Sequence, residues 1–188
     1  MKTRVILLPL VVSLLVGGYP AVQGVQAEQP VQVAQPKWEQ FSSPEGGFTV
    51  LMPAKPTQQT KTTEGEVLSL EDHRFTASLE QGKVTYSVSY TDFPDEVSKL
   101  PSNVILDSIG SHFTNDSKLK GLNQQDIKLG EYSGKEFKFE SSGETLVKHR
   151  VYLVKQRLYQ IVTEIPKARE SELSKDVEKF MSSFQLLK

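Results

Sequence analysis

Three histidines, His73, His112 and His149, are the first candidates for chemistry in this sequence. None has another histidine three to five residues away, the spacing with which helices and fingers bind zinc. His73 directly follows Glu71 and Asp72. Because imidazole and carboxylate groups bind divalent ions, Glu71, Asp72 and His73 form a candidate metal site. The alternative is a solvated charged strand.

Nucleophilic catalysis has little support in the sequence. His149 falls in the apolar phase of an expected strand, where it is either a core histidine or a ligand or base. His112 follows Ser111, but adjacent helical residues point about 100° apart, so the two do not form a dyad. The chain has no G-x-S-x-G motif and no cysteine for thiol chemistry. We therefore predict no catalytic residues and no enzyme.

Carboxylate pairs and paired glycines are equally uninformative. Asp92 with Asp95, or Glu136 with Glu140, are commonplace in a chain with 24% charged residues, so they do not indicate a glycosidase. Gly46-Gly47 precedes an expected strand, and no G-x-x-x-x-G-K-[ST] phosphate loop is present. We predict no cofactor.

A set of cations surrounds an expected hairpin turn: Lys148, Arg150, Lys155 and Arg157, with Tyr152 between them. Lys148, Arg150 and Tyr152 share one strand phase. These five residues are a candidate partner-binding surface for an acidic protein or for lipid headgroups. The alternative is a solubilising edge whose lysines oppose strand addition.

The first 27 residues have the layout of a secretory signal peptide. Lys2 and Arg4 precede an apolar run from Val5 to Val16, and Val25-Gln26-Ala27 supplies a small-residue cleavage pattern. The apolar run is shorter than the about 20 residues of a spanning helix. We expect cleavage after Ala27 and export to the periplasm or thylakoid lumen, with an uncleaved anchor as the alternative.

The expected mature chain keeps 161 of the 188 residues, since 27 are removed. Loss of Lys2 and Arg4 changes the formal net charge from −1 to −3, so nucleic-acid binding is not expected. Without cysteine, no disulfide supports the fold. We predict a flexible Gln- and Pro-rich segment at residues 28–37, then one domain at residues 38–188, which is monomeric and has no membrane-spanning segment.

Period-two alternation predicts two antiparallel hairpins. The first joins Phe75–Leu79 to Val84–Tyr90 through Gln81-Gly82, with one apolar face and one face rich in Ser and Thr. The second joins Val147–Leu153 to Leu158–Ile165. A short strand, Phe48–Met52, is expected to end before Pro53.

Spacings of three and four predict two helices. Ile105, Ile109 and Phe113 mark a helix from Ser102 to near Asn115. A closing helix carries an apolar stripe of Leu173, Val177, Phe180 or Met181, and Phe184. Hairpins imply antiparallel pairing, and amphipathic helices need a sheet face to cover. The fold class is therefore α+β, an antiparallel β-sheet flanked by helices.

Four segments carry a resemblance to a known family: WEQF at Trp38–Phe41, PEGGFTVLMPAKP at Pro44–Pro56, VYLVKQRLYQI at Val151–Ile161 and KFMSSFQL at Lys179–Leu186. From Trp38 on, the chain resembles the PsbP-like group of small exported bacterial proteins, which also includes DcrB-type periplasmic proteins. The resemblance implies an α/β/α sandwich with an antiparallel sheet. It also implies that Ser43–Pro56 is an architectural edge and not a site.

Members of that group include extrinsic subunits and assembly factors of photosystem II, and metal or halide effects are attributed to some. No metal motif of the group matches positions here. The resemblance implies a non-enzymatic binding or assembly module with a protein partner at or near a membrane. The alternatives are a small-ligand or metal-binding protein with a cavity between helices and sheet, and a hydrolase in which His149 or His112 meets a carboxylate and a hydroxyl.

Overall fold

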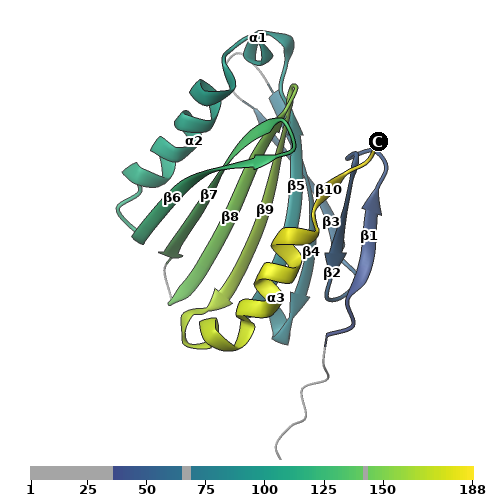
Figure 1. Ribbon diagram of the computed structural model, residues 1–188, viewed down its shortest axis with the longest axis vertical. Helices are drawn as coiled ribbons and strands as arrows, with labels where there is room; N and C mark the ends of the chain where they lie inside the picture. Colours follow the sequence, from purple (N-terminus) through teal and green to yellow (C-terminus); the bar gives the residue numbers. More distant parts are fainter. Residues whose placement is uncertain (1–35, 65–68, 142–143) are drawn as a thin grey trace, which may run out of the picture. The chain divides into compact units, whose positions relative to one another are not determined.

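The computed structural model describes residues 36–188, except 65–68 and 142–143 (Figure 1). The expected signal peptide, residues 1–27, and residues 28–35 of the expected flexible segment lie outside the described residues. Within the described part of the chain, no helix is long and apolar enough to cross a membrane.

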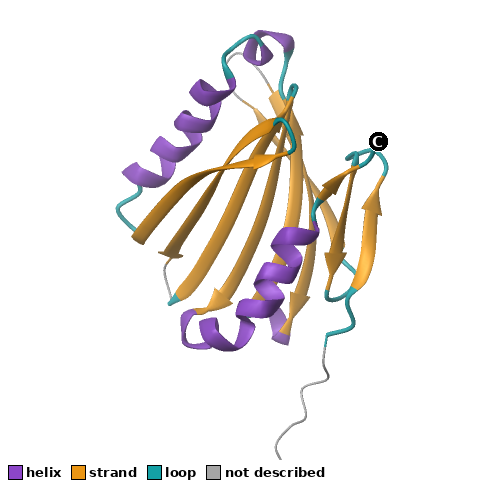
Figure 2. Ribbon diagram, in the orientation of Figure 1, coloured by secondary structure: helices purple, strands orange, loops and turns teal. Residues whose placement is uncertain are grey.

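A seven-stranded, fully antiparallel sheet dominates the described residues (Figures 1 and 2). Both predicted hairpins are confirmed, as the pairs β4–β5 and β8–β9. In spatial order the strands are β3 (Thr57–Glu64), β4 (Ser69–Leu79), β5 (Val84–Asp92), β9 (Arg157–Pro166), β8 (Thr145–Val154), β7 (Tyr132–Ser141) and β6 (Lys120–Leu129).

A second, three-stranded sheet has β2 at its centre. The strands are β1 (Glu39–Ser43), β2 (Phe48–Met52) and β10 (Gln185–Leu186), and both pairings are antiparallel. The predicted strand Phe48–Met52 is confirmed with the predicted bounds. The segment Ser43–Pro56 thus supplies the turn, the central strand and the exit of this small sheet. The implied architectural edge is corrected here, because β2 is paired on both sides.

Both predicted helices are present, together with short helical segments. Helix α2 (Ser102–Asn115) and helix α3 (Glu170–Ser183) are the long ones. The short ones are α1 (Asp95–Ser98) and the 3-10 turns η1 (Glu80–Gly82) and η2 (Lys167–Arg169). In α3 the predicted stripe is buried, including both Phe180 and Met181.

The two long helices cover opposite faces of the large sheet. On the face toward α2, called the α2 face here, Val147, Val151 and Leu153 of β8 pack with Ile105 and Leu106. On the other side, called the α3 face, Leu146 and Tyr152 of β8 join the cluster that holds α3 and the small sheet. Alternation along one strand therefore serves two separate cores.

Helices flank the sheet less completely than the sandwich prediction implied. Helix α3 contacts β2 and β9, and the small sheet covers the rest of that apolar cluster. Helix α2 contacts β6, β7 and β8 only, among the element pairs with substantial contact. The described chain is mostly antiparallel sheet, with helices over part of each face (Figure 2).

The hydroxyl-bearing side of β5 is more buried than its composition predicted. Ser87, Ser89 and Thr91 lie on the α2 face, yet Ser89 is only 2% exposed. Its register neighbours are Arg74 on β4 and Gln160 on β9. Long side chains on both flanking strands shield a short one between them, which sequence periodicity does not reveal.

Gly134 on β7 is the position where the sheet tolerates no side chain. A Cβ there would lie 2.4 Å from the carbonyl oxygen of Val151 and 2.5 Å from a ring carbon of Tyr152. We expect Gly134→Ala to lower the free energy of unfolding by about 2–3 kcal/mol, because backbone and a buried ring must both move. Urea unfolding measures this change.

The neighbouring substitution Ser133→Ala is the control, because Ser133 is only half-buried. It should change the free energy of unfolding by no more than about 0.5 kcal/mol. Equal stability of the two variants would mean that Tyr152 does not occupy the space above Gly134.

Candidate functional site

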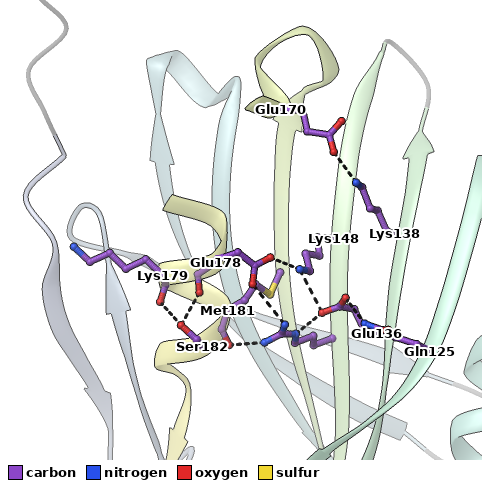
Figure 3. Close-up of polar contacts among 10 residues, drawn as sticks. Gln125, Glu136, Lys138, Lys148, Glu170, Glu178, Lys179, Met181 and Ser182 are labelled. Carbon is purple, nitrogen blue, oxygen red and sulfur yellow. Dashed lines mark hydrogen bonds and ion pairs between the residues drawn. The ribbon is translucent and has the colours of Figure 1, made fainter. Parts of the chain in front are cut away.

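Two of the predicted partner-binding cations, Lys148 and Arg150, lie in an intramolecular ion network on the α3 face. Figure 3 labels Lys148 with its partners Glu136 and Glu178. Arg150 Nε donates to Glu136 Oε2 at 2.5 Å, and Gln125 Nε2 donates to Glu136 Oε1 at 2.9 Å. Lys148 Nζ lies 3.5 Å from Glu136 Oε2 and also pairs with Glu178 of α3. The lysine therefore links the sheet to the helix.

Arg150 also caps the end of helix α3. Its Nη1 donates to the carbonyl oxygen of Met181 at 3.0 Å, in the last turn of the helix. A cation at this end meets unpaired carbonyls and the negative pole of the helix dipole. Ser183 helps at the same end by accepting a 2.9 Å hydrogen bond from the backbone N–H of Leu51. These contacts fix α3 on both sheets.

Glu136 is the centre of the network. Burial acts to raise the pKa of Glu136, but the hydrogen bond and charge of Arg150, with the charge of Lys148, outweigh it and lower the pKa. The side chains of Arg150, Lys148 and Glu136 are only 18%, 17% and 10% exposed. Each therefore has its partner inside the fold.

The predicted surface of Lys148, Arg150, Tyr152, Lys155 and Arg157 is thus corrected, since these residues do not form one exposed patch. Tyr152 is 6% exposed and stacks parallel to Phe184, with ring centroids 6.3 Å apart. A buried tyrosine and two internally paired cations therefore do not form one exposed patch with Lys155 and Arg157. The prediction that Lys148, Arg150 and Tyr152 share one face of the strand is confirmed, but α3 covers that face.

A small cavity lies beside the network, between α3 and the sheet. Its volume is about 90 Å³ and its apolar lining is Leu146, Ile165 and Val177. The pair Lys138–Glu170 and the pair Lys148–Glu178 flank it. One water takes about 30 Å³, so this space suits a few waters and not a ligand.

Arg157 is held at the other end of β9, near the small sheet. Its Nε and Nη2 donate to the two carboxylate oxygens of Asp92 at 2.6 Å each, and its Nη1 donates to the carbonyl of Glu45 at 2.8 Å. The guanidinium carbon lies 4.5 Å from the ring centroid of Tyr90. The hydrogen bond to Asp92 raises the pKa of Arg157. The side chain is immobilised and half-buried.

Lys155 differs from the other four predicted residues. It lies in the β8–β9 turn with φ of 57°, its side chain is exposed, and it has no ion pair among the described residues. It borders a hollow of about 350 Å³, whose apolar lining includes Tyr132, Val154 and Leu187. Leu187 is 43% exposed. An open apolar hollow with a free cation at its rim suits an acidic, partly apolar partner segment.

The predicted metal residues Glu71, Asp72 and His73 are divided between two faces of β4. His73 Nε2 lies 3.6 Å from Glu71 Oε2 on the α3 face. Asp72 points to the α2 face, where it accepts a hydrogen bond from Thr91 and pairs with Arg74. In the described part of the chain, no three His, Cys, Asp or Glu side chains gather as a metal site would require. Strand alternation thus separates the predicted three-residue set.

His149 is a core histidine, one of the two alternatives that the sequence left open. Its ring packs edge-on against Phe113 at 5.3 Å and near Phe137 at 6.2 Å. Burial lowers the pKa of His149 to about 4, although a hydrogen bond with Gln160 opposes the shift. Its Nε2 has no hydrogen-bond partner among the described residues. In the part of the chain that the structure describes, its Nε2 therefore has no carboxylate or hydroxyl partner of the kind that a hydrolase would need.

A hollow that the sequence did not indicate lies between α2 and the β6–β7 hairpin. Its volume is about 430 Å³. Lys135 bridges two carboxylates at its wall, with Nζ 3.0 Å from Asp107 Oδ1 and 2.8 Å from Asp126 Oδ1. Asp107 and Asn103 lie on one helical face four residues apart, but only the tertiary fold brings Asp126 and Lys135 to them.

Comparisons with known proteins bear on the fold. No family model matches this chain, and no curated protein matches it significantly. Among solved structures, it is similar to the solution structure of cyanobacterial PsbP (CyanoP) from Synechocystis sp. PCC 6803. The TM-score is 0.53 and the identity is 14% over 86% of this chain and 98% of that chain. This chain has a PsbP-like fold.

The PsbP-like fold agrees with the resemblance carried by Trp38–Phe41, Pro44–Pro56 and the closing helix. An identity of 14% shows the architecture alone. The function of the chain therefore has to be argued from its own surfaces.

The ion network generates a stability prediction. Arg150→Met should lower the free energy of unfolding by about 2–4 kcal/mol, because the nearly buried Glu136 carboxylate keeps only Lys148 as a charged partner. Denaturant unfolding at neutral pH measures the loss. Lys138→Met is the matched control: its pair with Glu170 is 49% and 44% exposed, so about 0–1 kcal/mol is expected. Equal losses would contradict the central role of Glu136.

His149 generates a pH prediction. The unfolded chain takes up a proton on this residue below about pH 6.5, whereas the folded chain does so only below about pH 4. Stability contributed by the neutral ring is present above pH 6.5 and is lost as the pH falls toward 4. From pH 7 to pH 5 this loss should be about 2 kcal/mol.

His149→Leu should remove that part of the decline, as measured by urea unfolding at several pH values. His112→Asn, which replaces an exposed histidine, should retain the wild-type decline. A His149→Leu profile parallel to that of the wild type would show that burial does not suppress protonation of this ring.

Proposed function

We propose that this chain is an exported, non-enzymatic binding or assembly module that docks on a protein complex at or near a membrane, such as photosystem II. The observation that carries the proposal is the likeness to cyanobacterial PsbP over 86% of the chain. The export part rests on the signal-peptide pattern in residues 1–27 and predicts the periplasm or the thylakoid lumen. A relationship to DcrB-type periplasmic proteins belongs to the same proposal.

The proposed docking surface is the sheet end around Lys155. The sequence singled out four cations and one tyrosine as a binding surface. Of these, Lys155 is the exposed residue without an ion pair in the described part of the chain. Beside it, Tyr132, Val154 and Leu187 line the 350 Å³ hollow. Arg157, fixed by Asp92, gives that hollow a rigid polar wall. An acidic segment with an apolar side chain complements this combination.

Lys155→Glu should weaken co-sedimentation of the purified protein with native membranes of its source organism by about tenfold, since a charge reversal at an interface rim acts on association. Binding of the wild type should also fall as salt is raised, because exposed charges are screened. Lys118→Glu is the control, with the same charge change in the loop before β6, at the opposite end of the sheet.

Crosslinking with mass spectrometry on the same membranes identifies the partner. Crosslinks from Lys155 to one membrane-complex subunit are expected. Equal binding of the Lys155→Glu and Lys118→Glu variants would eliminate this surface, and a wild type without any crosslinked partner would eliminate docking itself.

A small-ligand carrier is the second candidate, favoured by the 430 Å³ hollow between α2 and the sheet. This volume falls within the range of small-molecule sites, about 300–1,000 Å³. The pair Glu71 and His73 remains the metal-binding part of that hypothesis. A thermal-shift screen with divalent ions and small organic acids and amines tests it, since a ligand of the folded state raises Tm. Unchanged Tm values across the screen would remove it.

A further inference from the structure

Among the described residues, strand β3 is an open edge of the large sheet, and the charged side chain of Lys61 is its main protection against pairing. It is the terminal strand, all eight of its residues are exposed, and its outer backbone groups have no strand partner among the described residues. Its register with β4 is unbroken from Thr57↔Thr76 to Glu64↔Ser69. No proline, glycine or bulge interrupts it. Such an edge is a template for another strand.

The opposite edge, β6, is protected in several ways. Its register with β7 shifts between Lys120 and Asn123, and Gly121 there has φ of 63°. Helix α2 packs along it, and Asp126 is engaged by Lys135. Bulges, charges and a covering helix are the usual means of blunting an edge. Within the described residues, β3 is therefore the one edge of the large sheet that is left regular and uncovered.

The sequence of β3, TQQTKTTE, is complementary to itself in one register. Two copies of β3 can pair antiparallel around a two-fold axis perpendicular to the sheet. Residues that lie opposite each other then point to the same face, and because side chains alternate along a strand, the numbers of the two residues differ by an even amount. An axis at Thr60 pairs Gln59 with Lys61, Gln58 with Thr62 and Thr57 with Thr63. No like charges then lie directly opposite each other.

Neighbouring registers are worse. An axis at Lys61 would place two ammonium groups opposite each other, which is destabilising. An axis at Gln59 would bring Pro56, which lacks an N–H group, into the ladder. An axis at Thr62 would shorten the ladder because β3 ends at Glu64. The Thr60 axis alone uses the strand from Thr57 to Thr63 without conflict.

Lys61 is the one residue of β3 that would ordinarily oppose strand addition. It is in register with Asp72 on β4 of its own chain, so a carboxylate lies beside it. Across the axis it faces the neutral side chain of Gln59. The two lysines of a pair are offset by two residues and are free to point away from each other.

We propose that β3 is a homotypic docking edge: two copies of this chain pair β3 with β3 antiparallel around Thr60 and join their sheets. Because the contact is one polar strand, it is weak and depends on concentration. It gives the docking module proposed above a second, separate surface. The proposed dimer differs from the monomer that the sequence predicted, and the experiments below decide between them.

Single-cysteine variants test the register directly, because the chain has no cysteine of its own. The purified full chain is treated with a short bismaleimide. In the proposed pair, the two copies of residue 60 lie opposite each other, with their Cβ atoms about 5 Å apart in Thr60→Cys. The two copies of residue 63 are six residues apart along the strand direction, so the thiols of Thr63→Cys are separated by about 20 Å. Thr60→Cys should form crosslinked dimer at least about tenfold faster.

A mixed experiment fixes the register further. Gln59→Cys and Lys61→Cys proteins, mixed in equal amounts, should crosslink to each other faster than either does to itself. Equal rates for Thr60→Cys and Thr63→Cys, or no dimer with either, would overturn the proposal. Slow maleimide labelling of Thr60→Cys without dimer would also overturn it, since the edge would then be occupied by something else.

Sedimentation velocity gives an independent readout that needs no cysteine. The wild type should show a concentration-dependent shift toward dimer, and Thr60→Glu should abolish it, because two carboxylates would then face each other. Asn123→Glu, on the other edge strand, is the matched control and should leave the shift intact. Both positions are exposed, and Thr60→Glu removes only the exposed 3.1 Å contact of Thr60 Oγ1 with His73 Nδ1, so Tm should change by a few degrees at most. The docking proposal and the dimer proposal are tested separately by Lys155→Glu. This variant should lose membrane binding and still form the dimer.

Discussion

The register of the β8–β9 hairpin is the constraint on which the rest of this fold depends. Strand β8 buries side chains on both faces, with Val147 and Val151 toward α2 and Leu146 and Tyr152 toward α3. A slip by one residue would exchange the two sets and destroy both clusters. The tight turn fixes the register through Lys155, whose φ of 57° lies in the left-handed region. Lys155 therefore holds the turn with its backbone while its side chain is exposed.

The same register also places two charged side chains, Lys148 and Arg150, on a covered face of the sheet. Lys148 and Arg150 alternate along β8 with Val147 and Val151, which are buried on the α2 face. Both charged side chains therefore lie on the other face, under α3. The fold accommodates them with Glu136, Glu178 and the carbonyl of Met181. Such a network contributes little net stability compared with a fully apolar replacement, but removal of a single partner is costly because it leaves another charge uncompensated. Lys148 and Arg150 also connect the sheet to α3, through Glu178 and the carbonyl of Met181.

Buried polar groups are accounted for by internal contacts: His149, for example, contacts aromatic rings and an amide. Among the described residues, the features that internal contacts leave open include the hollow beside Lys155, the hollow between α2 and the β6–β7 hairpin, and the outer edge of β3. We propose docking at the first and the last of these, and the second has the volume of a small-ligand site.

The sequence by itself determined the elements: both hairpins, both long helices and the strand Phe48–Met52 follow from periods of two and of three to four, since these are local properties of the chain. Strand alternation likewise places Glu71 and Asp72 on opposite faces of β4. Only the tertiary structure decided which cations are paired, because Glu136 and Glu178 reach Lys148 from elements far away in the sequence. Likewise, the hollow at Asp107 and Lys135 and the open edge at β3 depend on strand order, which long-range packing selects and local periodicity does not encode.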